Sequence, residues 1–147
     1  MDLRVNTLRR TREEVLAALN GEGLGAKSTA FSPVGIRLST RMPLQNLPMW
    51  KDGTLEIQDE GSHFRALLCN AQPGMAIIDY CAGAGGKSLI LAETMKNKGR
   101  LVLFDIQDWG LKRSKERLNR AGVHNYELRP LSEATWFKAK RRVLIMF

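Results

Sequence analysis

The chain has 147 residues and a mass of 16.5 kDa, which is enough for one domain or for a compact domain with a small appendage. Its composition, 44% apolar and 26% charged, is typical of globular proteins and excludes disorder over the whole chain. No segment reaches the roughly 18 consecutive apolar residues of a membrane helix, and the opening MDLRVNTLRRTREE lacks the apolar core of a secretory signal. We therefore expect a cytoplasmic protein with no membrane partner.

The cysteines and histidines exclude two classes of small domain. There are two cysteines, Cys69 and Cys81, and two histidines, His63 and His124, with no CxxC motif. This excludes a disulfide scaffold, and we expect no metal site. The simplest compartment is a reducing cytosol.

The net charge of +8 is concentrated in the second half of the chain. Residues 1–60 contain eight basic and eight acidic side chains, whereas residues 61–147 contain fifteen and seven. Such a basic half suggests a polyanionic partner, most often nucleic acid. A solvated helix face followed by a basic loop explains the same charge, so both interpretations stay open. The densest basic positions are Lys112, Arg113, Lys115, Arg117, Arg120, Lys138, Lys140, Arg141 and Arg142.

The first 58 residues contain the signals of a small α+β unit. A short strand is expected over 3–8. Thr11 and Glu14 then form a capping box that opens a helix ending at Gly21. A hairpin over 29–41 and a turn at 52–53, followed by an apolar alternation, complete the unit. The alternative is that these residues are an N-terminal extension of a single domain.

The second half alternates strands and helices. This order predicts a parallel, doubly wound sheet with right-handed crossovers, hence an α/β fold. The expected elements are a helix capped by Ser62 and stopped at 72–74, strands over 76–81, 100–106, 125–129 and 142–147, and helices over 88–98 and 109–121.

A glycine-rich loop, DYCAGAGGK over residues 79–87, lies between the first buried strand and the next helix. Glycines there let a ligand approach the backbone closely, and the helix N-terminus presents free N–H groups. A P-loop is excluded because Cys81 stands where its first glycine belongs. The dinucleotide fingerprint matches Gly83 and Gly85 but has Ser88 at its third position.

A pocket for S-adenosylmethionine is the third template for this loop. It needs an acidic residue at the strand end, a glycine-rich turn and a carboxylate that ends the next strand, and Asp79 and Asp105 supply the two acidic groups. NAD uses a carboxylate at the second position too, so the spacing leaves NAD open. A tight turn without any ligand is the remaining interpretation.

Four segments resemble the bacterial Sun/NOP-type RNA (cytosine-5) methyltransferases: QDEGS over 58–62, the loop over 79–87, Asp105, and LKRSKERLNRAG over 111–122. The resemblance begins at LRVNT over 3–7. It implies a truncated Rossmann-like methyltransferase sheet over 59–147, preceded by a small α+β subdomain over 1–58 on the RNA side. It also implies that S-adenosylmethionine contacts Cys81, Ala82, Gly83, Ala84, Gly85, Gly86, Lys87 and Asp105.

The activity that the resemblance implies is methyl transfer to C5 of cytosine in RNA, most naturally ribosomal RNA. The family has proline where Ala84 stands. Its fourth strand carries an Asp-x-Pro-Cys motif and a later strand carries a second cysteine, one of which attacks C6 of cytosine while the other assists release; these 147 residues contain neither. Cys69 is interpreted as a buried helix residue and Cys81 as a lining residue of the cofactor pocket. We therefore expect no catalytic residue here and a catalytically incomplete fragment.

Two other functions remain open from the sequence. One is a non-catalytic RNA-binding module that uses the basic half, and the other is a nicotinamide dehydrogenase. An open sheet that ends at its fourth strand also exposes an apolar edge, from which we expect self-association.

Overall fold

The computed structural model describes residues 1–131 and 143–146. It divides into two compact units, Met1–Arg65 and Ala66–Phe147, and each is described by itself. In the described residues, no helix combines the length and apolarity that crossing a membrane requires.

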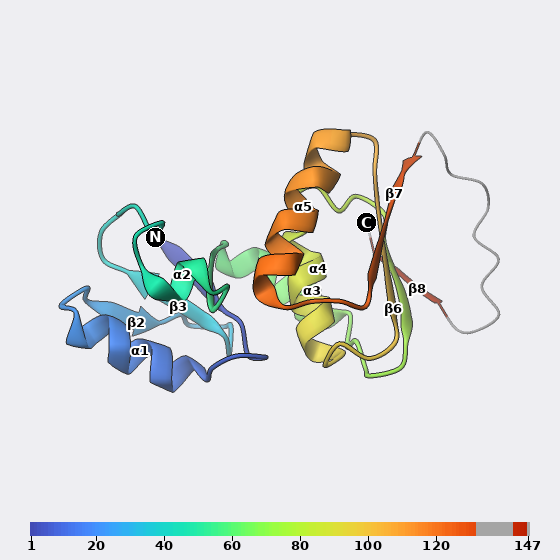
Figure 1. Ribbon diagram of the computed structural model, residues 1–147. Coiled ribbons are helices and arrows are strands. Elements are labelled where there is room, and N and C mark those ends of the chain that lie inside the picture. Colours follow the sequence, from blue (N-terminus) through green and yellow to red (C-terminus); the bar gives the residue numbers. More distant parts are fainter. Residues whose placement is uncertain (132–142, 147) are drawn as a thin grey trace. The chain divides into compact units, whose positions relative to one another are not determined.

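The N-terminal unit combines a sheet with helices (Figure 1), and it extends to Arg65, beyond the boundary at residue 58 expected from the sequence. Its four-stranded antiparallel sheet has the order β2-β3-β1-β4. Helix α1 contributes Val15 and Leu19 to a core that also contains Leu3 and Ile36. The elements are β1 (Asp2–Val5), α1 (Arg12–Gly21), β2 (Ala26–Ser28), β3 (Gly35–Leu38), α2 (Pro48–Lys51) and β4 (Leu55–Ile57).

The predicted capping box of α1 is confirmed. The Thr11 hydroxyl accepts a hydrogen bond from the Glu14 amide at 3.3 Å, and the Glu14 carboxylate accepts one from the Thr11 amide at 2.8 Å. Two amide groups that a helix leaves unpaired at its start are thereby satisfied.

Two expectations for this unit need correction. The hairpin forms, but β2 begins at Ala26, and residues 29–34 are a loop between the strands. The turn at 52–53 forms as well, but the segment before it is the short helix α2, because Pro48 occupies a first-turn position where its missing N–H is tolerated.

Helix α3 (Glu60–Leu68) spans the division between the units. Ser62 was expected to cap this helix, but Asp59 does so. Its carboxylate accepts hydrogen bonds from the amide and the hydroxyl of Ser62, at 3.0 and 2.6 Å. A carboxylate at that position also interacts favourably with the helix dipole, and the pKa of Asp59 is lowered, chiefly by Ser62.

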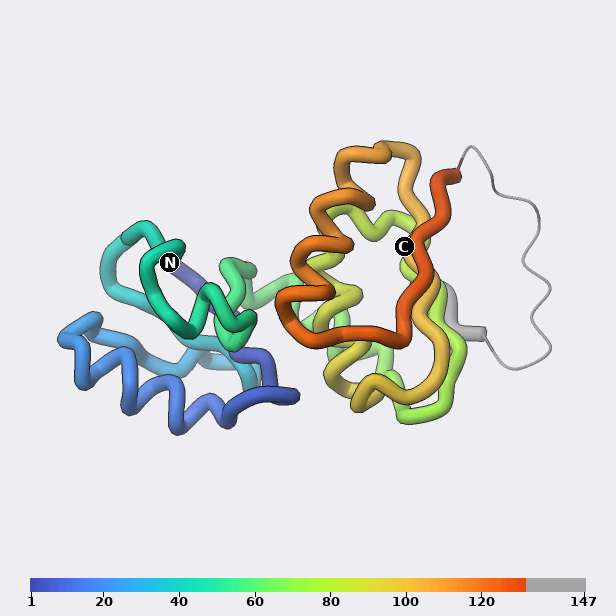
Figure 2. The backbone as a smooth tube through the Cα atoms, in the orientation of Figure 1, coloured from blue at the N-terminus to red at the C-terminus, as the bar shows by residue number. Residues whose placement is uncertain are grey.

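The C-terminal unit is a parallel sheet with the strand order β7-β6-β5-β8, as the alternation of elements predicted. In Figures 1 and 2 the chain passes from β5 through α4 to β6 and from β6 through α5 to β7, with both helices on one face of the sheet. The elements are β5 (Ala76–Asp79), α4 (Gly86–Thr94), β6 (Arg100–Asp105), α5 (Asp108–Ala121), β7 (Tyr126–Pro130) and β8 (Val143–Met146).

Burial on both faces explains why β5 and β6 are continuous apolar runs. Ile77 and Leu101 are fully buried, and Ile78, Val102 and Phe104 form a second cluster with Leu131 packed against it. Alternate residues of a strand point to opposite faces, so a strand covered on both sides lacks polar alternation. The first of these strands ends directly before the glycine-rich loop.

Candidate cofactor-binding site

The loop over residues 80–85 follows the carboxyl end of β5 and leads into α4. Gly83 and Gly85 have φ angles of +53° and +75°, in the left-handed region that glycine adopts without strain. A side chain on Gly85 would also collide with α5, because its Cβ would lie 2.9 Å from the Cβ of Ser114. Backbone conformation and packing therefore both require glycine at position 85.

Asp105 fastens this loop to the end of the neighbouring strand. One carboxylate oxygen accepts a hydrogen bond from the Gly83 amide at 2.7 Å, and the other accepts one from the Gln107 amide at 2.9 Å. The Ala82 amide also donates to the Phe104 carbonyl at 3.0 Å. A carboxylate has about four acceptor positions, so two remain for the hydroxyls of a ligand.

Asp79 anchors the base of the loop. It is fully buried, and its carboxylate accepts a hydrogen bond of 2.6 Å from the Ser88 hydroxyl in the first turn of α4. Burial raises the pKa of Asp79, while Ser88 and the nearby Lys87 ammonium act in the opposite direction. Asp79 therefore connects β5 to α4.

Helix α5 contributes two residues that the sequence analysis missed. A Cβ on Gly110 would lie 3.1 Å from the Gly83 carbonyl oxygen, so this glycine lets the helix approach the loop. Ser114 is fully buried next to Gly85, and its hydroxyl donates to the Leu111 carbonyl at 2.8 Å. The available signal was Gly110 itself, since a glycine inside a helix costs about 1 kcal/mol relative to alanine and indicates a packing reason.

The other predicted cofactor residues lie in or directly after the loop. Cys81 is exposed, Ala82 is buried, and Ala84, Gly86 and Lys87 are half-buried.

Cys69 and His63 are shielded from solvent to different degrees. Cys69 lies just beyond the end of α3 and is half-buried, which corrects the expectation of a buried helix residue. Burial raises the pKa of its thiol and disfavours the nucleophilic thiolate. His63 is fully buried, with its Nδ1 3.0 Å from the Ser32 hydroxyl.

The basic residues of α5 divide by exposure. Lys112, Arg113 and Lys115 are exposed, and Arg117 and Arg120 are half-buried. Lys138, Lys140, Arg141 and Arg142 lie outside the described residues. Within residues 1–131 and 143–146, no cluster of three or more candidate metal ligands occurs.

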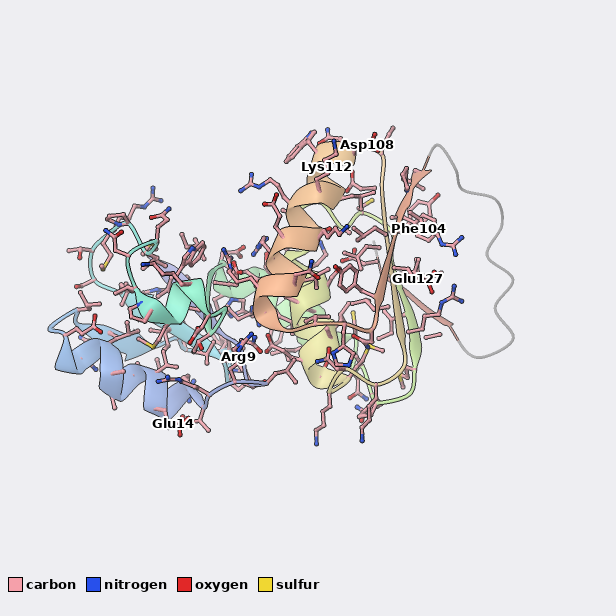
Figure 3. All side chains as sticks on the ribbon, viewed as in Figure 1. Arg9, Glu14, Phe104, Asp108, Lys112 and Glu127 are labelled. Atoms are coloured by element: carbon pink, nitrogen blue, oxygen red, sulfur yellow. The ribbon has the colours of Figure 1, made fainter. Side chains whose placement is uncertain are left out.

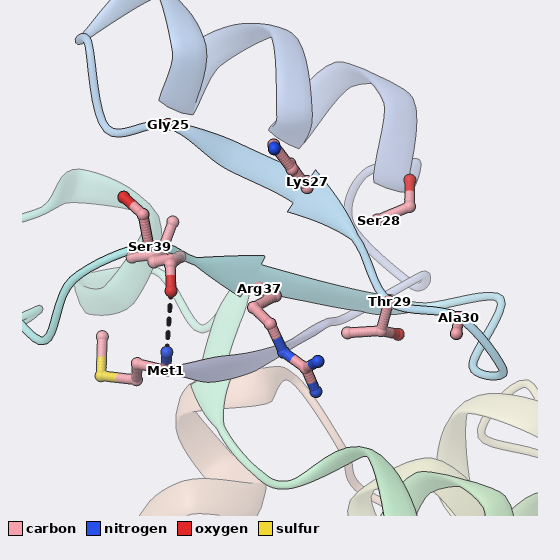
Figure 4. A pocket seen from close by; sticks show the side chains of 9 residues that line it. Met1, Gly25, Lys27, Ser28, Thr29, Ala30, Arg37 and Ser39 are labelled. Atoms are coloured by element: carbon pink, nitrogen blue, oxygen red, sulfur yellow. Dashed lines mark hydrogen bonds between the residues drawn. The ribbon is translucent and has the colours of Figure 1, made fainter.

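A pocket of about 550 Å³ lies on the N-terminal unit (Figure 4). Lys27 and Arg37, opposite each other on β2 and β3, line it. The Arg37 guanidinium makes two hydrogen bonds of 2.7 Å to Asp2, so its charge is already compensated. We assign no ligand to this pocket.

Two family models match the chain. One, described as an RsmF/B-like methyltransferase ferredoxin-like domain, matches residues 1–45, and the other, described as 16S rRNA methyltransferase RsmB/F, matches residues 66–138.

Individual relatives and a solved structure agree with these matches. Ribosomal RNA small subunit methyltransferase B of Proteus mirabilis is 37% identical over 124 residues, which cover 84% of this chain and 29% of the relative. The protein of the same name from Pseudomonas syringae is 33% identical over 123 residues, or 84% and 28% of the two chains. The crystal structure of a methyltransferase homolog from Pyrococcus horikoshii superposes with a TM-score of 0.80 at 29% identity, covering 87% of this chain and 42% of that one. The chain thus spans less than a third of the length of these two curated relatives.

Proposed function

Since this chain belongs to the RsmB/F family of Sun/NOP-type ribosomal RNA methyltransferases, we propose that its C-terminal unit binds S-adenosylmethionine. The proposed contacts are residues 81–87, which comprise most of the glycine-rich loop and the start of α4, together with Asp105. The observation that carries the proposal is the hydrogen bond from Gly83 to Asp105, which brings the glycine-rich loop and the acidic end of β6 together. Ligands of open α/β sheets bind outside the carboxyl ends of the strands, where this pair lies.

The residues present suit this cofactor in shape and in chemistry. Among residues 1–131, nothing lies within 4 Å of the position that a Cβ on Gly83 would occupy, so this side of the backbone is open there. The two remaining acceptor positions of Asp105 match the paired hydroxyls of a ribose. The first amide groups of α4 and the Lys87 ammonium match the carboxylate of an amino-acid moiety.

When bound, S-adenosylmethionine supplies an activated methyl group. The residues of this chain would bind and orient the cofactor. Asp105 would accept hydrogen bonds from the ribose hydroxyls, and the N-terminal end of α4 would attract the carboxylate of the amino-acid moiety. Exposed apolar side chains at Ile106 and Trp109 border the same strand end and offer surface for the base. The described loop is already held by hydrogen bonds, which lowers the entropy lost on binding.

A calorimetric titration with S-adenosylhomocysteine, with NAD as the comparison ligand, tests the proposal. We expect saturable binding of S-adenosylhomocysteine and none of NAD at the same concentration. A preference for NAD would identify a dinucleotide site, and binding of neither would remove the cofactor proposal.

We further propose that methyl transfer by the whole enzyme goes to C5 of a cytosine in ribosomal RNA, and that this chain alone does not complete it. Its two cysteines are Cys69, whose thiol is half-buried, and Cys81, which lies in the cofactor loop. Neither stands in the Asp-x-Pro-Cys context that carries one of the family's two catalytic cysteines. Transfer of a labelled methyl group to RNA by the purified chain would contradict this.

RNA is the proposed partner, and the exposed cations of α5 are the surface proposed for its phosphates. Lys112, Arg113 and Lys115 project from this helix, and phosphate contacts release counterions, so binding should weaken steeply with salt. Salt-dependent RNA binding without binding of S-adenosylhomocysteine would instead favour a non-catalytic RNA-binding module.

Cytoplasmic location and self-association stay predictions. In the described residues, β8 pairs with β5 alone. Strand edges that lack a partner promote further pairing. A single monomeric species in sedimentation would contradict self-association.

A further inference from the structure

One face of α5 contacts three consecutive residues of the glycine-rich loop. Gly110, Ser114 and Arg117 are spaced by four and three positions, so they lie on the same side of the helix. Gly110 packs against Gly83, and Ser114 packs against Gly85. The third residue, Arg117, reaches the peptide between these two glycines.

Arg117 donates a hydrogen bond of 2.8 Å from Nη1 to the carbonyl oxygen of Ala84. The amide on the other end of the same peptide group, that of Gly85, donates to the Ala82 carbonyl at 2.8 Å. The orientation of this peptide is therefore fixed from both sides. A charged donor makes a stronger hydrogen bond than a neutral one, and Arg117 is half-buried, which limits screening by water.

This contact matters because the glycines of the loop give its backbone high conformational freedom in the absence of restraints. Gly83 and Gly85 flank Ala84, and glycine loses more conformational freedom on ordering than any other residue. The Asp105 carboxylate restrains the loop at Gly83, on the strand side, whereas Arg117 restrains it at Ala84, on the helix side.

We propose that Arg117 is a positioning residue for the cofactor loop: its guanidinium holds the peptide between Ala84 and Gly85 so that the loop is ordered before S-adenosylmethionine binds. The identity of the ligand in this inference rests on the proposed function. The restraint itself does not, because the hydrogen bond from Arg117 to Ala84 is present without any ligand. This hydrogen bond also separates Arg117 from Lys112, Arg113 and Lys115 of the same helix, which are exposed to solvent.

The experiment compares Arg117→Ala and Arg117→Lys with two control variants, Asp108→Ala and Glu116→Ala. Both control residues are exposed on the same helix, and Asp108 lies at its N-terminal end (Figure 3). Hydrogen exchange of the amides over residues 83–88 is measured without ligand, S-adenosylhomocysteine affinity by calorimetry, and melting temperature as a check on folding.

We expect Arg117→Ala to accelerate exchange in this segment and to weaken S-adenosylhomocysteine binding about tenfold, the effect of losing a charged hydrogen bond. Arg117→Lys keeps a charged donor and should restore part of both losses, while the control variants match the parent. Unchanged exchange and affinity in Arg117→Ala would overturn the inference. So would equal losses in the alanine and lysine variants together with a lower melting temperature, because they would indicate general destabilisation.

The two proposals fail separately. If the parent chain does not bind S-adenosylhomocysteine, the proposed function fails, and the exchange data alone then decide for or against Arg117. If the parent binds and Arg117→Ala binds equally well, the positioning role fails and the function stands.

Discussion

The amide of Gly83 and the carboxylate of Asp105 are joined by a hydrogen bond of 2.7 Å that connects the ends of two adjacent parallel strands. The acidic residue at the end of β6 therefore has a structural partner inside the protein as well as acceptor positions for a ligand. Removing it should affect the shape of the loop and the contacts of the cofactor together.

Substitution of Asp105 should separate these two contributions. Asp105→Ala removes the acceptor of the Gly83 and Gln107 amides, and we expect S-adenosylhomocysteine affinity to fall about tenfold or more. Asp105→Asn keeps one carbonyl oxygen and should be intermediate. Asp108→Ala, three residues further and exposed, is the control. Equal calorimetric affinities for Asp105→Ala and the parent would contradict the assigned site.

Gly110→Ala should weaken cofactor binding without loss of stability. The added methyl group would lie 3.1 Å from the Gly83 carbonyl oxygen and push the loop, whereas alanine favours the helix by about 0.5–1 kcal/mol. The matched control is Gly21→Ala at the end of α1, where no atom of the part of the chain that the structure describes lies within 4 Å of the new Cβ. Calorimetry and a thermal melt check both effects, and a Gly110→Ala variant with parental affinity would show that the loop tolerates the displacement.

Ser88→Ala should destabilise the C-terminal unit at neutral pH. It removes the hydroxyl that donates to the buried Asp79 carboxylate, and hydrogen bonds to charged groups contribute about 1.5–3 kcal/mol. Thr94→Ala is the control, because the Thr94 hydroxyl donates to the Ile90 and Leu91 carbonyls of its own helix, at 3.0 Å each. Urea denaturation of both variants measures the difference, and equal losses would refute a special role for the Asp79 contact.

The stability of the N-terminal unit should fall on mild acidification because of His63. Burial, together with the nearby Arg4, lowers the pKa of His63 below its ordinary value of 6.5. The unfolded chain then binds a proton more readily than the folded one, so stability is full above pH 6.5 and is lost as the pH falls toward the lowered pKa. Carboxylates with lowered pKa values, such as Glu60, stabilise the fold fully above their ordinary value of 4.5 and lose that contribution only below it, so they do not account for a change between about pH 7.5 and about pH 5.

Urea denaturation at about pH 7.5 and about pH 5 tests this prediction in the parent and in His63→Gln. The parent should lose more stability than the variant between the two conditions, and the subtraction removes contributions from other groups such as Asp79. An identical loss in both proteins would exclude His63 as the cause.

Sequence patterns predicted two kinds of element: those stabilised by residues close together in the chain, and strands that are apolar along their whole length. The capping box joins residues three positions apart, and the strands over 76–79 and 100–105 are apolar because both faces are buried. The loop and Asp105 could be assigned together because parallel strands bring their carboxyl ends to one edge. The spacing of these residues suits both S-adenosylmethionine and NAD, and the family resemblance favoured S-adenosylmethionine.

The contacts that hold the site were not predictable in the same way. Gly110 and Ser114 act on the loop through the packing of α5. A glycine inside a helix indicates close packing, but nothing in the sequence around either residue identifies the loop as the neighbour. The choice of Asp59 over Ser62 as the helix cap shows a related limit, since both residue types are good caps and only the observed start of α3 decides.

The order β7-β6-β5-β8 has a consequence for how the domain matures during synthesis. Strand β5 is made early but receives its second neighbour from residues 143–146, which are paired in register with residues 76–79. Such a distant pairing forms slowly because a long segment must first be closed. While the ribosome is still adding the intervening residues, the strand that carries the glycine-rich loop has one open side. A nascent chain should therefore complete this sheet late, and premature release would expose that side of β5 to other chains.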